Sequence, residues 1–531
     1  MKHINKIFAT ILLAFAFTAC EDFLEPNSKS EFVPKDATSL NELLLGEAYQ
    51  RNDMSGFNVF LGLLDDDIQA TAYQIPNDNY NENKYLGSFA WQPNMFEMME
   101  LANSGHTNMY EKYYELILGT NAVLDYLPTV TDSEEMKGYV KAQAHALRGF
   151  YYFNLVNIFG APYNNNPDSL GNALGVPLKL HSGIEASEEA LKRKTVAEVY
   201  AQILKDLHTA DSVFNELPES YQFKKKERVN LPMVQLMLSR TYLYMENWEK
   251  AAEYAKLVMD NPRFSFLDLN DVPTTTVNSD GKTVRIYPYY PTSTSTEAIW
   301  LYGNVDDMFG WTCYGTGTEN PNNNNKKMHA YFQASEELLS LFNDMDLRRE
   351  RYIIETDMTD GTLMPMAYGK IYVGSQYLPK NATTTGVFGR CIRLSEAYLN
   401  YAEAQIQMGG EGLGNAVEAL NTLRERRFDP EDDFEVEVEI DVENQSELLN
   451  FVKDERRREL CFEGHRWFDL RRWGMPEIKH VWYYKDYKAE YTLKERDLMY
   501  TVPIPKEAMD ENPQLVQNEL PERRVGAGIH N

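Results

Sequence analysis

The chain has 531 residues, with 52 Lys and Arg against 80 Asp and Glu, which gives a formal net charge of −28 at pH 7. A surface this acidic repels phosphate backbones, so the composition argues against nucleic acid as a partner. The length is ample for a large core, and a chain of this length usually divides into more than one region. No apolar run reaches the roughly 20 residues that a membrane-spanning helix needs.

The first 19 residues predict a secretory signal peptide. Lys2 and Lys6 precede an apolar run over residues 7–17, which is too short to span a bilayer, and small residues follow up to Ala19. A cut after Ala19 would leave Cys20 at the mature N-terminus, where its thiol is the acyl acceptor of a bacterial lipoprotein. Two or more acyl chains, palmitate among them, hold a protein firmly on a membrane, whereas one chain is marginal. The alternative is a plain secretory cut in which Cys20 is incidental.

Two long helices are predicted in the first half of the chain. Apolar residues recur at steps of three or four from Val140 to Ile158, and Gly160 and Pro162 end this helix. The segment "TVAEVYAQILKDLHTADSVF" predicts the second helix, with Thr195 as its N-cap.

Helix pairs are predicted further along the chain. The segment "VQLMLSRTYLYMENWEKAAEYAKLVMDNP" (234–262) predicts two helices joined by a turn at Glu246 and Asn247, and it resembles a tetratricopeptide repeat. A second pair is predicted over residues 393–427. Its glycines at 409, 410, 412 and 414 are expected to form the turn between the helices, because no strand precedes them as a nucleotide loop requires. The predicted fold is mainly α, with tetratricopeptide-like helix pairs as a scaffold and long irregular loops that build a ligand-binding face.

Three long segments, 57–108, 263–330 and 355–390, are rich in Asn, Thr, Gly, Pro and aromatic residues. Loops of this length within a compact protein are usually functional. Sugars present flat apolar faces edged with hydroxyl groups, so aromatic rings beside Asp and Asn suit a sugar. The same Asn and acidic residues would serve a peptide equally well by binding its main-chain amides. The aromatic candidates are Tyr73, Tyr80, Tyr85, Trp91, Tyr289, Tyr290, Trp311 and Tyr314, whereas Trp300 is predicted to lie in the core and Trp248 in a helix pair.

Two acidic clusters are the candidates for catalytic chemistry. Residues 455–474 bring Glu459, Glu463, His465 and Asp469 together, but arginines three or four positions away predict ion pairs on one half-buried helix rather than two catalytic carboxylates. The expected pairs are Asp454–Arg458, Glu455–Arg458, Glu463–Arg466 and Arg466–Asp469. The second cluster, Asp65–Asp67, has three interpretations: it binds a sugar hydroxyl, acts as acid and base, or ends a helix in solvent.

The remaining motifs predict no chemistry. The sequence contains no nucleophile with its base, no phosphate loop and no metal-ligand spacing, so we expect neither an enzyme nor a cofactor or metal. Cys313, Cys391 and Cys461 are widely spaced and are expected to be small packing residues. Residues 434–443, "FEVEVEIDVE", alternate strictly and predict a strand or arm with one charged, solvated face.

Several long segments, in one constant order, resemble the SusD/RagB family. The C-terminal signatures are "ERRRELCFEGHRWFDLRRWG" (455–474) and "VPIPKEAMDENPQLVQN" (502–518). Upstream matches are "CEDFLE", "ALRGFYYFNLVNIFGAPY", "RKTVAEVYAQILKDL", "LSRTYLYMENWEKAAEYA" and "RLSEAYLNYAEAQ". The resemblance covers nearly the whole chain. One departure is Met109, where the family often has Trp, and we interpret it as repacking.

The resemblance implies a lipoprotein of the outer membrane that faces the cell exterior and is anchored through Cys20. Such proteins capture an oligosaccharide, or in some members a peptide, and deliver it to a TonB-dependent SusC-like transporter. Glu21 and Asp22 resemble that group's signal for surface export. Residues 20–230 would form an N-terminal region with the anchor and the first binding loop, and residues 231–531 a C-terminal region interleaved in the same fold. A surface glycoside hydrolase is the remaining alternative.

The same resemblance implies where a ligand binds. Family members of known type contact their ligands through loops in the two aromatic-rich regions. By that likeness, we expect Asp66, Trp91, Asn94, Tyr290 and Trp311 to contact the ligand. Loop composition predicts the chemistry of contact and does not name the ligand.

Overall fold

The computed structural model describes residues 34–50, 59–71, 82–101, 108–166, 170–183, 188–277, 283–285, 287–303, 314–317, 327–330, 332–357, 363–366, 388–429, 444–484 and 487–529. Helices dominate these ranges, and the strands form only small antiparallel sheets. The predicted mainly α class is confirmed. Of the helices in these ranges, none combines the length and the apolar character that crossing a membrane requires. The alternating segment 434–443 lies outside the described residues.

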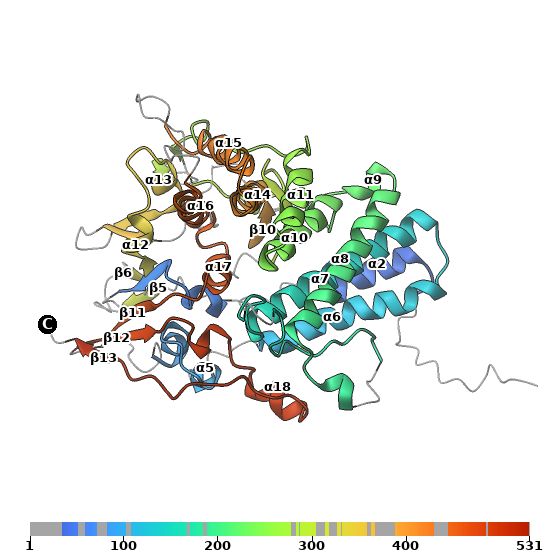
Figure 1. Cartoon of the computed structure of the whole chain (residues 1–531), viewed down its shortest axis with the longest axis horizontal. Coiled ribbons are helices and arrows are strands. Elements are labelled where there is room, and N and C mark those ends of the chain that lie inside the picture. Colours follow the sequence, from blue (N-terminus) through green and yellow to red (C-terminus); the bar gives the residue numbers. More distant parts are fainter. Residues whose placement is uncertain are drawn as a thin grey trace, which may run out of the picture.

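A bundle of long helices forms one end of the molecule, on the right of Figure 1. Its central member, α7, contacts α2, α6 and α8. The predicted boundaries are confirmed: α7 ends at Gly160, and Thr195 caps α8 in a reciprocal capping box with Glu198. The helices of this end are α2 (Ala37–Glu47), α6 (Met109–Tyr126), α7 (Glu134–Phe159), α8 (Val196–Glu216) and α9 (Glu219–Gln222).

Two helix pairs continue from the bundle towards the middle of the molecule (Figure 1), as predicted. They are α10 (Leu231–Tyr244) with α11 (Trp248–Met259), and α14 (Leu394–Met408) with α15 (Gly412–Arg424). The first turn places Glu246 at φ 59° before the N-cap Asn247. In the second turn, Gly409 and Gly410 have positive φ, which glycine adopts at no steric cost. Glycines 412 and 414 lie inside α15 rather than in the turn, which corrects their predicted place.

The two pairs stack although more than a hundred residues separate them in the chain, because α11 packs on α14. Small side chains allow this approach: Ser239 on α10 donates to the Ala251 carbonyl at 2.9 Å, and Asn400 on α14 donates to the Ser239 hydroxyl at 3.3 Å. The apolar core runs through the bundle and both pairs, and a smaller apolar cluster joins α14 and α15 to α16. Trp300 is buried in this core, as predicted.

The remaining elements are mostly short, and many of them lie at the opposite end of the molecule, on the left of Figure 1. The paired strands are β1 (Ile68–Ala70) with β7 (Phe332–Ala334), β2 (Thr275–Val277) with β3 (Thr283–Arg285), β4 (Ala298–Tyr302) with β10 (Arg390–Arg393), β5 (Tyr314–Gly317) with β6 (Lys327–Ala330), β8 (Ile354–Asp357) with β9 (Leu363–Met366), and β11 (Ile478–Tyr483) with β12 (Lys488–Leu493) and β13 (Ala527–Ile529). The remaining helices are α4 (Gly87–Phe89), α5 (Met95–Leu101), α12 (Glu336–Leu339), α13 (Arg348–Tyr352), α16 (Gln445–Leu460), α17 (Arg466–Arg472) and α18 (Lys506–Glu511). Short 3-10 or π turns cover Val59–Leu63, Glu82–Leu86, Leu127–Thr129, Glu188–Leu191 and Leu498–Tyr500.

The predicted single helix over 455–474 is wrong, because the chain turns between α16 and α17. Phe462 and Gly464 both have positive φ there. The turn changes which side chains meet, so the prediction of local ion pairs holds only for Glu455–Arg458, at 2.7 Å. Two of the others pair across the fold, Glu463 with Arg393 and Arg466 with Asp66. Asp469 instead pairs with Arg456 of α16 and with Arg472, its neighbour three positions on in α17.

A buried lattice of carboxylates and guanidinium groups joins α16 to three other segments. Glu459 accepts hydrogen bonds from Arg393 at 2.6 Å, from Arg427 at 3.1 Å and from Arg348 at 3.2 Å. Glu455 accepts from the same Arg348 at 2.6 Å. Burial favours the neutral acid, but the three guanidinium charges hold the pKa of Glu459 well below its usual range. These carboxylates therefore lock elements together. Cys461, next to this lattice, is buried as predicted.

Candidate ligand-binding site

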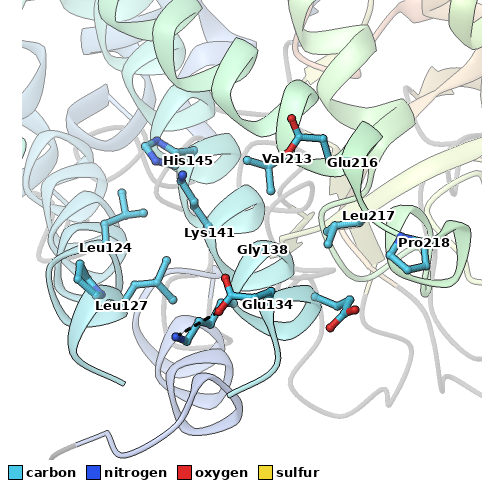
Figure 2. A pocket seen from close by; sticks show the side chains of 13 residues that line it. Leu124, Leu127, Glu134, Gly138, Lys141, His145, Val213, Glu216, Leu217 and Pro218 are labelled. Carbon is cyan, nitrogen blue, oxygen red and sulfur yellow. Dashed lines mark ion pairs between the residues drawn. The ribbon is translucent and has the colours of Figure 1, made fainter. Parts of the chain in front are cut away.

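Among the described residues, two hollows stand out as large enough to hold a small ligand. The first lies between the end of α6, α7 and the end of α8, has a volume of about 770 Å³, and is drawn in Figure 2. Its lining mixes leucines with charged side chains, including a Lys137–Glu134 pair at 3.6 Å, and contains no Phe, Tyr or Trp among the described residues. Of the residues predicted to bind ligand, none that the structure describes lies there. This hollow therefore lacks the aromatic and amide groups that a sugar would contact.

The second hollow, called the β1–β11 hollow below, lies at the opposite end of the molecule and has a volume of about 430 Å³. Strand β1, the start of α12 and strand β11 form its walls. Its lining residues are Asp66, Ile68, Gln69, Ala70, Phe89, Ser335, Glu336, Glu337, Glu477, Ile478, Lys479, His480, Val481 and Tyr483. Of the predicted ligand contacts that lie within the described ranges, Asp66 alone is among these.

Asp66 is held rigidly at the wall of the β1–β11 hollow. Arg466 donates to both of its carboxylate oxygens, at 2.6 and 2.8 Å, and Arg457 lies 3.4 Å from Oδ2. Its backbone carbonyl accepts from the Ser335 hydroxyl at 2.6 Å. Burial opposes ionisation, but the hydrogen bonds from Arg466 and the charge of Arg457 lower the pKa of Asp66 to about 2. The carboxylate is therefore a fixed, ionised acceptor at neutral pH.

The interpretation of Asp65–Asp67 as a helix end in solvent is wrong. Asp65 and Asp67 are buried, and Asp67 accepts from Arg457 Nε at 2.9 Å. Burial together with the charges of Asp67 and Asp66 raises the pKa of Asp65 well above its usual range. A buried carboxylate needs a cationic partner. Arg457 of α16 pairs with Asp67 and Arg466 of α17 pairs with Asp66, although both arginines lie hundreds of residues later in the chain.

The prediction that Trp91 contacts ligand is wrong, because its side chain is fully buried. Its indole Nε1 donates to the Leu64 carbonyl at 2.9 Å. Its ring stacks on His480 at 4.3 Å, and Phe89 stacks on the other face of the imidazole at 4.1 Å. Trp91 therefore supports the floor of the β1–β11 hollow from below rather than lining it.

Tyr290 is also a packing residue, which corrects its predicted role. It is 1% exposed, its hydroxyl lies 2.8 Å from that of Tyr352, and the Arg393 guanidinium covers its ring at 4.5 Å. Asn94 is half-buried at the start of α5 and does not line either hollow. Trp311 and Cys20 lie outside the described residues, so both stay predictions.

The structure adds an aromatic group that sequence reasoning missed. Tyr483 ends β11 and lies, half-buried, at the β1–β11 hollow. Beyond it, Tyr484 and Tyr487 stack with ring centroids 4.5 Å apart at the tip of the β11–β12 hairpin, and Tyr487 is 47% exposed. The signal was present in the run "VWYYKDY" (481–487) between two alternating strands. It was overlooked because the run lies outside the long loops.

His480 makes the site region sensitive to acid. Burial lowers its pKa to about 4, although the carbonyls of Phe89 and Asp65 near its two nitrogens, at 2.7 and 3.0 Å, favour the cation. The pKa of an unfolded histidine is about 6.5, so the unfolded chain takes up the proton first as the pH falls. Stability is fully present above pH 6.5 and is expected to fall by roughly 3 kcal/mol as the pH drops to 4.

This loss can be measured as the change of the urea midpoint with pH. His480→Gln should make the urea midpoint depend less on pH between pH 6.5 and 4. His181→Gln, at an exposed histidine, should leave the pH dependence of the midpoint unchanged. An unchanged slope in His480→Gln would show that other groups cause the acid sensitivity.

Taken together, the described residues form a mainly α scaffold of helix pairs, with a candidate ligand-binding hollow among short strands and loops at one end. Two family models match the chain: "SusD family" over residues 278–521 and "Starch-binding associating with outer membrane" over residues 22–243. The chain belongs to the SusD/RagB family.

Individual relatives are distant in sequence but match along nearly the whole chain. The SusD-like protein P38 of Formosa agariphila is 22% identical, over 89% of this chain and 91% of that protein. The crystal structure of a SusD-like carbohydrate binding protein from Bacteroides vulgatus superposes with a TM-score of 0.63 at 18% identity, covering 91% of this chain and 98% of the other. A laminarin binding SusD-like protein superposes with a TM-score of 0.56 at 20% identity, covering 91% and 99%. These likenesses support the fold.

Proposed function

We propose that this protein captures an oligosaccharide at the β1–β11 hollow. The observation that carries the proposal is the combination, within one hollow, of a fixed carboxylate at Asp66, an amide at Gln69 and a phenol ring at Tyr483. A sugar presents hydroxyl donors at its edge and an apolar face, which match a carboxylate acceptor and a ring. Membership of a family described as starch-binding, and a laminarin-binding neighbour in fold, support the same class of ligand.

The mechanism is non-covalent capture. Asp66 does not have to be ordered on binding, because Arg466 already fixes it, so little conformational entropy is lost there. The Tyr484–Tyr487 pair next to the hollow extends the aromatic surface along the hairpin. On the basis of the family likeness, Asn94 and Trp311 are proposed to make further contacts with the ligand. Affinity is expected to be modest, because a capture protein must release its ligand.

The proposal also covers where in the cell the protein acts. Cleavage after Ala19 and acylation of Cys20 would anchor the protein to the outer membrane, facing the exterior. There it would deliver its ligand to a TonB-dependent SusC-like transporter. The family description "associating with outer membrane" supports the location. A peptide ligand is the alternative, since Asp66 and Gln69 would also bind main-chain amides.

The test is binding of the form without signal peptide and anchor (residues 21–531) to a panel of neutral polysaccharides and peptides. Tyr483→Ala is expected to weaken glycan binding about ten-fold, which is about 1.4 kcal/mol. The control is Tyr126→Ala, which removes an exposed tyrosine ring from α6 at the other end of the molecule. Equal loss in both variants would exclude the β1–β11 hollow, and binding of peptides in place of glycans would overturn the ligand class.

A further inference from the structure

We propose that the β1–β11 hollow selects uncharged oligosaccharides and rejects anionic ones, with Glu336 and Glu337 as the residues that determine this choice. The inference rests on the proposed capture function and names the substrate class of the same site. It follows from the balance of charge around the hollow rather than from its shape.

The charge of Asp66 does not drive the rejection. Arg466 pairs with it at 2.6 Å and Arg457 approaches it to 3.4 Å, so its negative charge is compensated inside the protein. Asp66 still offers oxygen lone pairs to a hydroxyl group. It can therefore bind a sugar without imposing a net charge on the hollow.

Glu336 and Glu337 are different, because both are exposed and have no ion-pair partner among the described residues. They occupy the first turn of α12, where the Ser335 hydroxyl accepts from the Leu338 amide at 3.2 Å. The Glu336 amide donates to Gln69 Oε1 at 3.2 Å, which ties this turn to β1. The backbone that carries the two carboxylates is thus fixed at the wall of the hollow.

Lys479, the one lysine among the described lining residues, does not offset them. Lys479 lies 3.8 Å from Glu477 and 3.6 Å from Glu490, so two other carboxylates already share its charge. The hollow therefore has an excess of negative charge, within a chain whose net charge is −28.

The negative charge of the hollow discriminates between neutral and anionic glycans. A hydroxyl group donates to a carboxylate, whereas a uronate or sulfate group has no proton to donate and is repelled. Since exposed charges are screened over about 10 Å at 0.1 M salt and about 3 Å at 1 M, the discrimination should depend on ionic strength.

The experiment compares neutral polymers with anionic derivatives of the same backbone: laminarin with carboxymethyl-laminarin, and dextran with dextran sulfate. At 20 mM NaCl, the neutral member that binds should bind at least about ten-fold tighter than its anionic derivative, and at 1 M NaCl the gap should shrink to about three-fold. In Glu336→Gln/Glu337→Gln, which keeps the side-chain length and an acceptor oxygen, the anionic derivative should bind about five-fold tighter at low salt while the neutral polymer changes less than about two-fold.

The control is Glu134→Gln/Glu135→Gln, which removes the same charge from the hollow of Figure 2. It should leave the discrimination unchanged. If this control, rather than the α12 variant, relaxes the discrimination, the binding site is the other hollow and the inference is overturned. Equal or tighter binding of an anionic polymer by the wild type also overturns it but leaves glycan capture standing. Binding of peptides with no binding of any neutral or anionic glycan refutes the capture proposal itself, which separates the two failures.

Discussion

Replacing Glu459 with Gln is expected to lower the free energy of unfolding by about 3–5 kcal/mol. The carboxylate is fully buried and accepts hydrogen bonds from Arg393, Arg427 and Arg348. An amide of the same size removes one negative charge and leaves three buried guanidinium groups short of compensation. Urea denaturation followed by tryptophan fluorescence measures the shift.

The matched control is Glu447→Gln, in the first turn of the same helix, where the side chain is exposed. This change should cost less than about 1 kcal/mol, since exposed charges contribute little. A loss below about 1 kcal/mol in Glu459→Gln would show that the lattice is not a source of stability. Because its pKa is depressed, Glu459 contributes stability above the pKa of an unfolded glutamate, near 4.3, and loses it only as the pH falls below that value.

Replacing Gly119 with Ala is expected to destabilise the helical bundle by about 1–3 kcal/mol or more. A Cβ atom at this position of α6 would lie 2.3 Å from the Glu47 carbonyl oxygen at the end of α2. The end of α2 cannot withdraw easily, because the Tyr151 hydroxyl of α7 donates to the Ala48 carbonyl at 2.5 Å. The alanine side chain would therefore force the backbone of α6 away from the backbone at the end of α2.

Gly46→Ala provides the comparison, since nothing lies within 4 Å of a Cβ atom there and the residue is helical in α2. Alanine is the better helix former, so this variant should be neutral or more stable by up to about 1 kcal/mol. Differential scanning calorimetry of both variants separates close packing from helix propensity. An unchanged melting temperature in Gly119→Ala would mean that α2 and α6 can separate without loss.

The buried lattice also has a consequence for the candidate site. Residues of α16 and α17 extend from the lattice to the β1–β11 hollow, where Arg457 and Arg466 hold Asp67 and Asp66. The segment 455–474, which carries a cluster of carboxylates, therefore positions the site through its arginines. Its catalytic interpretation finds no support in these contacts, since guanidinium groups occupy Glu459 and Glu463.

Local sequence determined the helices of this protein. The apolar periodicity of α7, the N-cap Thr195 of α8 and the turn at Glu246–Asn247 act within a few residues of each other. These signals depend only on neighbouring residues and not on the rest of the chain. The order of matching segments was likewise sufficient to indicate the family, and with it the mainly α fold.

Only the tertiary structure decided the partners of the charges and the exposure of the rings. Arg466 was predicted to pair with neighbours on one helix, yet it pairs with Asp66, 400 residues away in the chain. Trp91 and Tyr290 lie in sequence segments whose composition suits a sugar site, yet both side chains are buried. Tyr483 lies outside those segments, yet it lines the β1–β11 hollow. Whether a ring is exposed, and which cation meets a carboxylate, depends on segments that are distant in sequence. Periodicity and spacing report only on near neighbours, so the folded chain alone could settle these contacts.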